Sequence, residues 1–256
     1  YEGVNLANKF TGTVTISDNT LSNNLTHGIT ITAATDLVME LNSITSSDGG
    51  VIGLDISGVT NSTTIGNPAN DAKVNTIDGF ATGINLANSA ALHDTIIKNA
   101  STVGLKINSA TATVTIDDHT SNNTNALGID INAHAATTIT GSTFNLVDGQ
   151  TAIQIAADAN DLNVSTSKFV DNNNATNTEV AIQNNDATNT VVAASNWYNH
   201  ADGPVHDDDA AVGGRIKVNG KLNFSPFYTT DALDNSLIDY RLKATKNGGA
   251  ITYHTY

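Results

Sequence analysis

Apolar and polar residues alternate in short runs along most of the chain. Within Thr13 to Ser17 every second residue is apolar, and Leu37, Met39 and Leu41 repeat the same rhythm. Asn, Asp, Ser, Thr or Gly separates each run from the next. Alternation with a period of two is typical of β-strands, and these runs are too short for an amphipathic helix. The pattern therefore predicts brief strands joined by tight polar corners.

A four-residue signature, a small residue followed by aliphatic, variable and aliphatic residues, returns about every 25 residues. Its copies begin at Gly3, Gly28, Gly53, Gly83, Gly104, Gly128, Ala152 and, in a weaker form, Ala181. The steps between them are 25, 25, 30, 21, 24, 24 and 29 residues. A period in this range is typical of a solenoid, in which each repeat buries its apolar face only against its neighbours.

Three short strands with polar corners would form one rung of a parallel β-helix, with inward Ile, Val and Leu stacked about 4.8 Å apart. The repeats predict an all-β rod of about eight rungs, roughly 40 Å long. The general preference for right-handed connections between parallel strands predicts a right-handed rod. The pairs Asn23-Asn24, Asn122-Asn123 and Asn172-Asn173 suit corners, and stacked Asn side chains can bond between rungs.

The texture of the sequence changes near residue 195 and divides the chain into three segments. We expect rungs over residues 1–194, a C-terminal cap over 195–230 and a short extension over 231–256. Aromatic and proline residues that would cover the last rung are Trp197, Tyr198, Pro204, Phe224, Pro226 and Phe227.

Three local elements are predicted at and beyond the cap. The Asn219-Gly220 pair between Val218 and Phe224 predicts a hairpin. The segment from Asp231 to Arg241 predicts a short helix with Asp231 as its N-cap. Gly248 to Tyr256 reads as a flexible joint followed by one alternating strand.

The cap also carries a resemblance. Asn196-Trp197-Tyr198 with Gly203-Pro204, then Val218 to Lys221 and Ser225-Pro226-Phe227, resembles the closing motif of right-handed parallel β-helix proteins of bacterial and archaeal surfaces. The resemblance implies a pectate-lyase-like fold and a prokaryotic extracellular or cell-surface location. Many such domains are non-enzymatic adhesin, surface-layer or sheath components, so it implies fold more strongly than chemistry.

The amino-acid composition limits which classes of binding partner suit this chain. The chain has 256 residues, no cysteine and a net charge of −14, with 11 Lys and Arg against 25 Asp and Glu. This balance disfavours nucleic acid and anionic membranes, which attract basic proteins. No stretch reaches the length of a membrane span. A chain without cysteine is compatible with an extracellular location.

An enzymatic reading has partial support. His27-Gly28, Asp117-Asp118 and Arg215-Ile216-Lys217 match parts of the series that polygalacturonases carry, but in another order and without Asn-Thr-Asp. Adjacent residues of a strand point to opposite sides, whereas hydrolysis needs two carboxylates across one cleft. A pectate lyase needs Asp ligands and a Lys or Arg in one groove, and both arginines lie outside the predicted rungs. No catalytic residue is assigned, and a polysaccharide lyase or glycoside hydrolase stays the alternative.

One loop is a candidate metal site. It carries His200, Asp202, His206, Asp207, Asp208 and Asp209. Carboxylates gathered in one loop can bind calcium, and a solvated acidic loop is the other interpretation because a regular ligand spacing is lacking. Calcium is thus the one candidate cofactor.

The two ends of the chain predict self-association. The chain starts within a rung, so Gly3, Val4, Asn5 and Leu6 would form an open strand edge. Ile251, Tyr253 and Tyr256 would supply a strand that pairs with this edge in another copy. A tail folded onto its own rod is the alternative. The hypothesis is a structural or adhesive module that assembles end to end into a fibre, sheath or surface layer, with polysaccharide or a cell surface as further partners.

Overall fold

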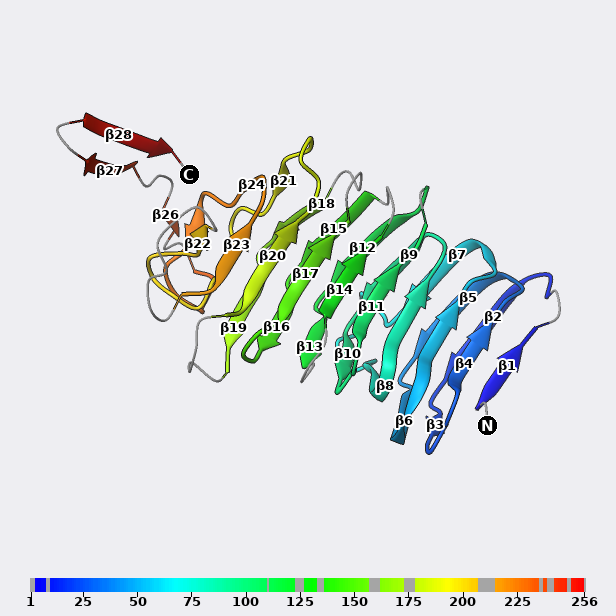
Figure 1. Cartoon of the computed structure of the whole chain (residues 1–256). Coiled ribbons are helices and arrows are strands. Elements are labelled where there is room, and N and C mark those ends of the chain that lie inside the picture. Colours follow the sequence, from blue (N-terminus) through cyan, green and yellow to red (C-terminus); the bar gives the residue numbers. More distant parts are fainter. Residues whose placement is uncertain are drawn as a thin grey trace.

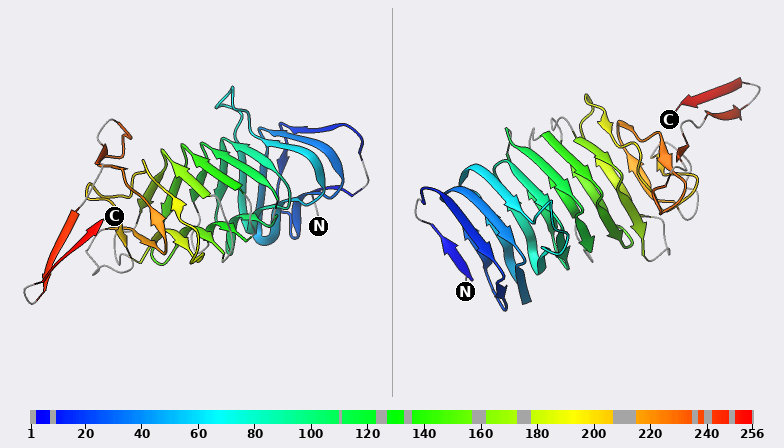
Figure 2. Two further views of the ribbon diagram at one scale, coloured as in Figure 1. Left: turned by 90° about the horizontal axis from the view of Figure 1, so that it is seen from above. Right: turned by 180° about the vertical axis from the view of Figure 1, so that it is seen from behind.

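The computed structural model of the chain is a rod in which short parallel strands stack along one axis (Figure 1). The first strand and a C-terminal hairpin lie at opposite ends of the rod (Figure 2). The structure describes residues 3–7, 10–109, 111–122, 127–132, 136–156, 162–172, 178–206 and 215–234, and the strand backbone of 237–238, 242–247 and 250–255. None of these residues is helical, which confirms the all-β prediction.

Each of the first seven rungs contains three strands, as predicted, and each strand joins a ladder of hydrogen-bonded neighbours. The first ladder consists of β1 (Val4–Leu6), β4 (His27–Ile31), the later part of β6 (Ser43–Ile56), the later part of β8 (Asn75–Leu86), β11 (Val103–Ile107), β14 (Leu127–Ile131), β17 (Thr151–Ile155), β20 (Val180–Asn184) and β23 (Lys217–Asn219), followed by β22 (Val205–His206).

The second ladder forms a sheet of its own. It consists of β2 (Thr13–Ser17), β5 (Ala34–Glu40), β7 (Val59–Ile65), β9 (Ala90–His93), β12 (Thr113–Asp117), β15 (Ala136–Thr140), β18 (Leu162–Ser165), β21 (Val191–Val192) and β24 (Leu222–Asn223).

The third ladder is continuous with the first, because β6 and β8 bend from one into the other. It consists of β3 (Thr20–Leu21), the early parts of β6 and β8, β10 (Thr95–Lys98), β13 (Thr120–Asn122), β16 (Thr143–Leu146) and β19 (Lys168–Asp171). Past the rungs, β25 (Phe227–Tyr228) pairs with β26 (Leu237–Ile238), and β27 (Leu242–Asn247) pairs with β28 (Ala250–Thr255).

Strand register confirms the period of the signature. Residues aligned in consecutive strands of the first ladder are Val4, Ile29, Leu54, Ile84, Leu105, Ile129, Ile153 and Ile182. Their steps of 25, 25, 30, 21, 24, 24 and 29 residues equal those between the signature copies. Ile182 then aligns with Val218. The solenoid therefore continues into the segment predicted as a cap.

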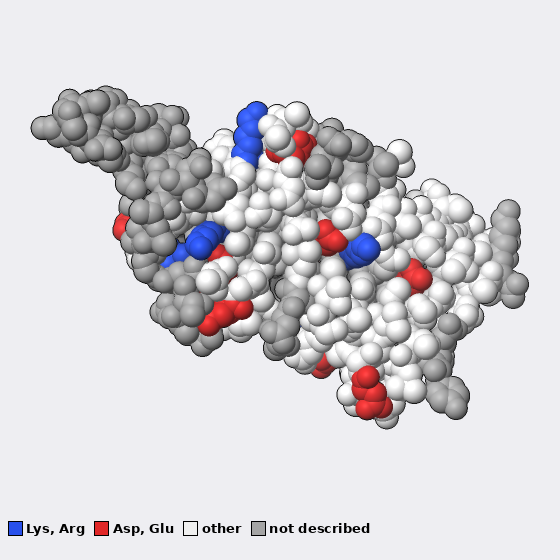
Figure 3. Space-filling model, in the orientation of Figure 1, with Lys and Arg blue, Asp and Glu red and all other residues white. Residues whose placement is uncertain are grey.

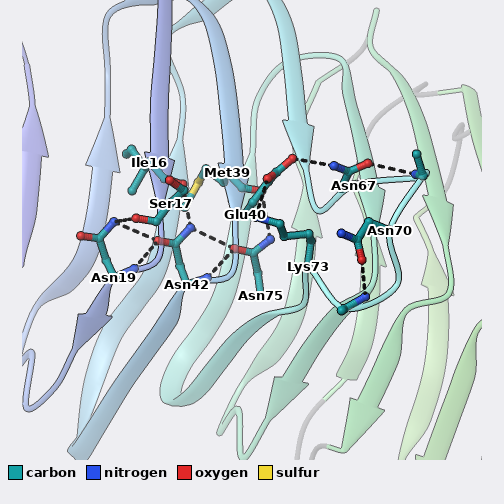
Figure 4. Close-up of polar contacts among 12 residues, drawn as sticks. Ile16, Ser17, Asn19, Met39, Glu40, Asn42, Asn67, Asn70, Lys73 and Asn75 are labelled. Atoms are coloured by element: carbon teal, nitrogen blue, oxygen red, sulfur yellow. Dashed lines mark hydrogen bonds and ion pairs between the residues drawn. The ribbon is translucent and has the colours of Figure 1, made fainter.

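The 30-residue step arises from a loop at one corner. Between β7 and β8 the chain leaves the rung at Asn67 and returns at Lys73 (Figure 4). Lys73 Nζ lies 3.4 Å from Glu40 Oε2, and Asn67 Nδ2 donates a hydrogen bond of 2.9 Å to Glu40 Oε1. The insertion is thus tied to the previous rung and leaves the ladders in register.

The small residue of the signature sits where the third ladder bends into the first. A Cβ atom added to Gly83 would lie 2.5 Å from the carbonyl oxygen of Gly104 and 2.6 Å from Ile97 Cγ2. Even a methyl group would therefore require a shift here, and a larger side chain would push the next rung and the core further apart. Ala152 and Ala181, both fully buried, occupy the equivalent place in later rungs.

We expect Gly83→Val to lower the free energy of unfolding by about 1–3 kcal/mol, because it overpacks this bend. Gly83→Ala is the matched control and should lose less, since alanine fills the same position at residue 152. Urea unfolding followed by circular dichroism measures both. Equal unfolding midpoints for Gly83→Val and the unaltered chain would contradict this role of the glycine.

A stack of polar side chains, all buried except that of Asn19, lines the corner between the second and third ladders (Figure 4). Asn19 Nδ2 donates to Asn42 Oδ1 (3.1 Å), and Asn42 Nδ2 donates to Asn75 Oδ1 (3.0 Å) and to the Ile16 carbonyl (2.8 Å). The same corner position in later rungs is Thr95, His119, Ser142, Ser167 and Asn196. The prediction that Asn side chains bond between rungs is confirmed at this corner, and also at one of the predicted pairs, where Asn145 Nδ2 donates to Asn122 Oδ1 (2.6 Å).

Backbone conformation explains why this corner repeats. The residue before the stacked position has a positive φ angle in most rungs, at Asp18, Leu41, Asp94, Asp118, Gly141, Thr166 and Ser195. A single left-handed residue turns the chain sharply and points the following side chain inward. The side chains of Asn42, Ser142, Ser167 and Asn196 then accept a hydrogen bond from a backbone amide of the preceding rung, since a buried backbone group needs a partner.

Aromatic rings continue the core into the C-terminal rungs. Phe144 and Phe169 stack with their centroids 5.2 Å apart, and Tyr198 stacks on Phe169 at the same distance. His119 meets the edge of this column 6.2 Å from Phe144 and is only 1% exposed. Burial lowers the pKa of His119 to about 4, so the imidazole is neutral at pH 7.

Two local predictions are wrong. The Asn219-Gly220 pair does not form a hairpin: β23 and β24 lie in different ladders and pair with β20 and β21, so this pair is a corner. The helix from Asp231 to Arg241 is contradicted as well, because the described backbone of residues 231–234 is irregular and β26 follows it. Asp231 is therefore no N-cap, and pairing of β26 with β25 replaces the helix.

Candidate functional site

The outward side chains of the first ladder form the polar row that is most recessed. Aligned along it are Asn5, Thr30, Asp55, Asn85, Lys106, Asp130, Gln154, Gln183 and Asn219. All but Asn5 are buried or half-buried although they face away from the core. Hydrogen bonds link neighbours: Asn85 Nδ2 donates to Asp55 Oδ1 (2.8 Å), and Asn219 Nδ2 donates to Gln183 Oε1 (2.8 Å). The row is a sheltered polar track along one side of the rod.

Asp130 is the most perturbed group of this row. It is 8% exposed, Asn132 Nδ2 donates to its Oδ2 at 2.6 Å, and its Oδ1 is buried without a hydrogen-bond partner within the described residues. Burial raises the pKa of Asp130, while the bond from Asn132 and the charge of Lys106 oppose the rise. A carboxyl with a raised pKa beside a lysine is a candidate for proton transfer or for binding polar ligands.

The spacing of the row limits the chemistry open to it. Asp55 lies three rungs from Asp130, which corresponds to about 14 Å at the usual strand separation. Pairs of carboxyl groups in glycosidases stand about 5–9.5 Å apart. Asp55 and Asp130 therefore do not form such a pair. Lys106 next to Asp130 is the closest approach in this row to the combination expected of a lyase.

A second set of ionisable groups gathers near the corner that follows the second ladder. A Cβ atom added to Gly141 would lie 2.5 Å from Asp118 Oδ1 and 3.4 Å from Asp117 Oδ1, so both carboxylates flank this glycine. The expectation that they point to different sides is wrong. Asp118 has a φ angle of 49°, in the left-handed region, so the strand geometry that separates adjacent side chains ends before it. Burial raises the pKa of Asp118, and the charge of Asp117 adds to the rise.

Neighbouring rungs extend this acidic corner. His93 Nδ1 lies 3.9 Å from Asp117 Oδ2. Burial raises the pKa of Asp94, with the negative charges of Asp71 and Asp118 acting in the same direction. No group of three or more His, Asp or Glu residues within the described ranges has the geometry of a metal site. The corner is thus an acidic patch with one histidine.

The candidate calcium loop is described only in part. Asp207, Asp208 and Asp209 lie outside the described residues. His200 Nδ1 accepts a hydrogen bond of 3.0 Å from the Asp202 amide and lies 4.0 Å from Asp202 Oδ2. His206 Nε2 lies 2.9 Å from the Gly220 carbonyl oxygen, to which it donates when that nitrogen carries the proton. Calcium binding at this loop stays a prediction.

Arg215 holds the cap together. Its guanidinium donates to the carbonyl oxygens of Gly203 (2.9 Å), Asp202 (2.9 Å) and Pro204 (2.5 Å). These bonds engage the arginine with the backbone of the Gly203-Pro204 turn. The partial match of Arg215-Ile216-Lys217 to a hydrolase series thus has a structural explanation.

The residues assigned to the cap lie mainly in the interior. Tyr198, Pro204, Phe224 and Phe227 are buried, and Trp197 and Pro226 are half-buried. The Tyr198 hydroxyl donates to the Ala193 carbonyl at 2.6 Å, and the Ser195 amide donates to the Pro226 carbonyl at 2.5 Å. These contacts attach the segment after the rungs to the last turn of the solenoid.

The two ends assigned to assembly are separate strands. Within the described residues β1 pairs only with β4, and β1 comprises Val4, Asn5 and Leu6 after Gly3. Ile251 and Tyr253 belong to β28, which pairs antiparallel with β27. Tyr256 lies outside the described residues. The terminal strand is confirmed, and its observed partner is the preceding strand of the same chain.

The family follows from a comparison with known proteins. A family model described as "Right handed beta helix region" matches residues 2–169. The chain belongs to the right-handed β-helix family. This confirms the handedness and fold predicted from the repeats. Comparison with the curated proteins and with the solved structures gave no match. In the described part of this β-helix, no helix is long and apolar enough to span a bilayer.

Lys106 and Asp130 are the functional candidates that sequence reasoning missed. Both occupy the third position of the signature, in Gly104-Leu105-Lys106-Ile107 and Gly128-Ile129-Asp130-Ile131. That position points outward in every rung. Aligning the signature copies and comparing their third residues would have placed the two side chains next to each other.

Proposed function

We propose that this β-helix is an extracellular structural or adhesive module that associates end to end through β1 and the C-terminal hairpin. The observation that carries the proposal is the first rung. Its inward side chains Val4, Leu6, Val14 and Leu21 pack on the core yet stay only half-buried. The outer edge of β1 has no strand beside it among the described residues. Apolar surface and strand edge together suit the addition of another strand.

The opposite end supplies a matching element. The hairpin β27–β28 projects from the end of the rod opposite β1 (Figures 1 and 2). β28 pairs with β27 through six aligned residue pairs, and within the described residues no strand pairs with its other edge. A hairpin edge of one copy laid along β1 of the next would join rods in a line. Main-chain bonds would provide the affinity of this contact.

Truncating the chain after Asn247 is expected to abolish end-to-end assembly while the rod stays folded. Removal of β28 leaves every rung intact, because β28 contacts β27 alone through strand pairing. Negative-stain electron microscopy of the full and truncated chains, with and without calcium, measures filament length. Circular dichroism checks that both are folded.

A synthetic peptide of residues 242–256 provides a second arm. Added in excess to the full chain it should occupy β1 and shorten the filaments, whereas a scrambled peptide should not. Filaments of unchanged length from the truncated chain, or single rods from the full chain, would refute end-to-end assembly.

A polysaccharide lyase or glycoside hydrolase is the alternative function. The observation in its favour is the recessed row, where Lys106 adjoins Asp130, whose pKa is raised by burial. The 14 Å estimated between Asp55 and Asp130 argues against a two-carboxylate hydrolase. Screening the same preparation against neutral and acidic polysaccharides separates this alternative from the structural proposal.

A further inference from the structure

The outward row of the second ladder differs from those of the other two ladders in its charge. Its aligned residues are Thr15, Val38, Thr64, Ala91, Thr115, Thr138, Asn163, Val192 and Asn223. None of the nine is ionisable. The corresponding row of the first ladder contains Asp55, Lys106 and Asp130, and that of the third contains Lys168.

This row is also open to solvent. Thr15, Thr115, Thr138, Asn163 and Asn223 are exposed, and Val192 is 43% exposed. Its side chains are short and mostly β-branched, so the face is flat. Nine strands at the usual spacing give the row a length of about 38 Å. The result is a straight, uncharged stripe along the rod.

The charge of the whole chain favours a particular occupant for this stripe. With a net charge of −14, two copies repel each other at most relative orientations. Charged groups are scattered among uncharged residues on the face in Figure 3, which gives that face no strong field of one sign. Two copies that meet along this row alone bury no ionised group of the row, while Asp36, Glu40 and Asp117 of the two neighbouring outward rows lie at the rim of the contact. We propose that the second ladder is a lateral contact by which one β-helix packs side by side against a second copy of this chain.

The area available sets the strength of this contact. A stripe about 38 Å long and one outward row wide, about 7 Å, offers roughly 270 Å² per rod. A stable pair usually buries about 800 Å² per partner. Single rods should therefore pair weakly, and rods already joined end to end should pair firmly, because the contacts repeat along the filament. Firm side-by-side pairing therefore depends on the end-to-end assembly proposed above.

The test places charge on the stripe of the full-length chain. Thr115→Glu with Thr138→Glu puts two carboxylates on adjacent, exposed strand positions. Ser22→Glu with Ser101→Glu is the matched control, because both serines are exposed between the third and first ladders and the added charge is the same. Electron microscopy counts rods or filaments with a side-by-side neighbour, and sedimentation velocity measures pairing of single rods.

We expect the Thr115/Thr138 variant to lower the fraction of rods with lateral neighbours at least about tenfold, since each carboxylate would be buried without a partner. The control should match the unaltered chain. Lateral bundles that persist in the Thr115/Thr138 variant overturn the proposal, as do single unbundled filaments of the unaltered chain, which would leave end-to-end assembly standing. Side-by-side pairs without filaments support the lateral contact and refute end-to-end assembly. Rods that stay monomeric but bind insoluble polysaccharide through Thr115 and Thr138 would assign the stripe to that ligand instead.

Discussion

Replacing Tyr198 with alanine should lower the free energy of unfolding of the C-terminal rungs by about 3–5 kcal/mol, as for other large aromatic side chains removed from a core. Tyr198 is fully buried, and its ring is nearly parallel to that of Phe169, with an interplanar angle of 7°. The ring closes the column that begins at Phe144. Without it, Phe169 would face a cavity at the last turn of the solenoid.

Tyr198→Phe is the matched control because it keeps the ring and removes only the hydroxyl. The Ala193 carbonyl would still accept a hydrogen bond of 2.7 Å from Asn196 Nδ2, so the loss should be about 1 kcal/mol. Each rung contacts mainly its neighbours, so the effect should concentrate near the cap. Amide hydrogen exchange along the chain measures this. Equal losses for alanine and phenylalanine, or faster exchange spread evenly to β2, would contradict the role assigned to the column.

The repeat made the fold predictable. Signature copies mark eight strands of the first ladder, and their spacing gave the register because small residues are required at each bend, as at Gly83. The ninth strand, β23, was missed since its alignment with Ile182 follows a step of 36 residues. In addition, Asn-Gly suits a corner as well as a hairpin. Gly220 has a φ angle of 83° and packs against the Asn184 carbonyl of the previous rung.

The buried corner stack was hidden by its variety. Asn, Thr, His and Ser share one structural position, as Asn42, Thr95, His119 and Ser142 illustrate. What these side chains have in common is a polar group on a short stem placed after a left-handed residue. No single residue type is specific to an inward polar side chain after a left-handed residue. The sequence pattern therefore predicted where the corners are, but not which side chains turn inward.

The candidate sites depended on information that only register supplies. Lys106 and Asp130 are separated by 24 residues in sequence and adjoin in the ladder. Asp94 and Asp118 are likewise one rung apart: burial raises the pKa of both, the charge of Asp118 adds to the rise at Asp94, and the charges of Asp71 and Asp117 add to the rise at both. The loop with His200 and Asp202 was easy to find in the sequence because its six candidate residues lie within ten positions. Clusters built across rungs are not conspicuous until the strands are aligned.

Glu179→Gln should stabilise the rod at pH 7 by about 1–3 kcal/mol, because glutamine does not ionise and each unit by which folding raises a carboxyl pKa is worth about 1.4 kcal/mol above that pKa. Glu179 is 1% exposed, and neither of its carboxylate oxygens has a hydrogen-bond partner within the described residues. Burial raises its pKa, and the negative charges of Asp171 and Asp148 add to the rise. The folded chain therefore holds a proton that the unfolded chain releases near pH 4.3.

The sign of the pH dependence follows from that proton. The contribution of Glu179 to stability is greatest below the unfolded pKa and is lost as pH rises through the folded pKa. Glutamine cannot ionise, so the variant and the unaltered chain should unfold alike near pH 3.5 and diverge toward pH 7. Glu40→Gln is the control: Glu40 pairs with Lys73 at 3.4 Å, so that variant should gain nothing at pH 7. Urea unfolding midpoints from pH 3.5 to 8 measure all three chains. A Glu179→Gln midpoint at or below that of the unaltered chain at pH 7 would show that the carboxylate finds a partner on folding.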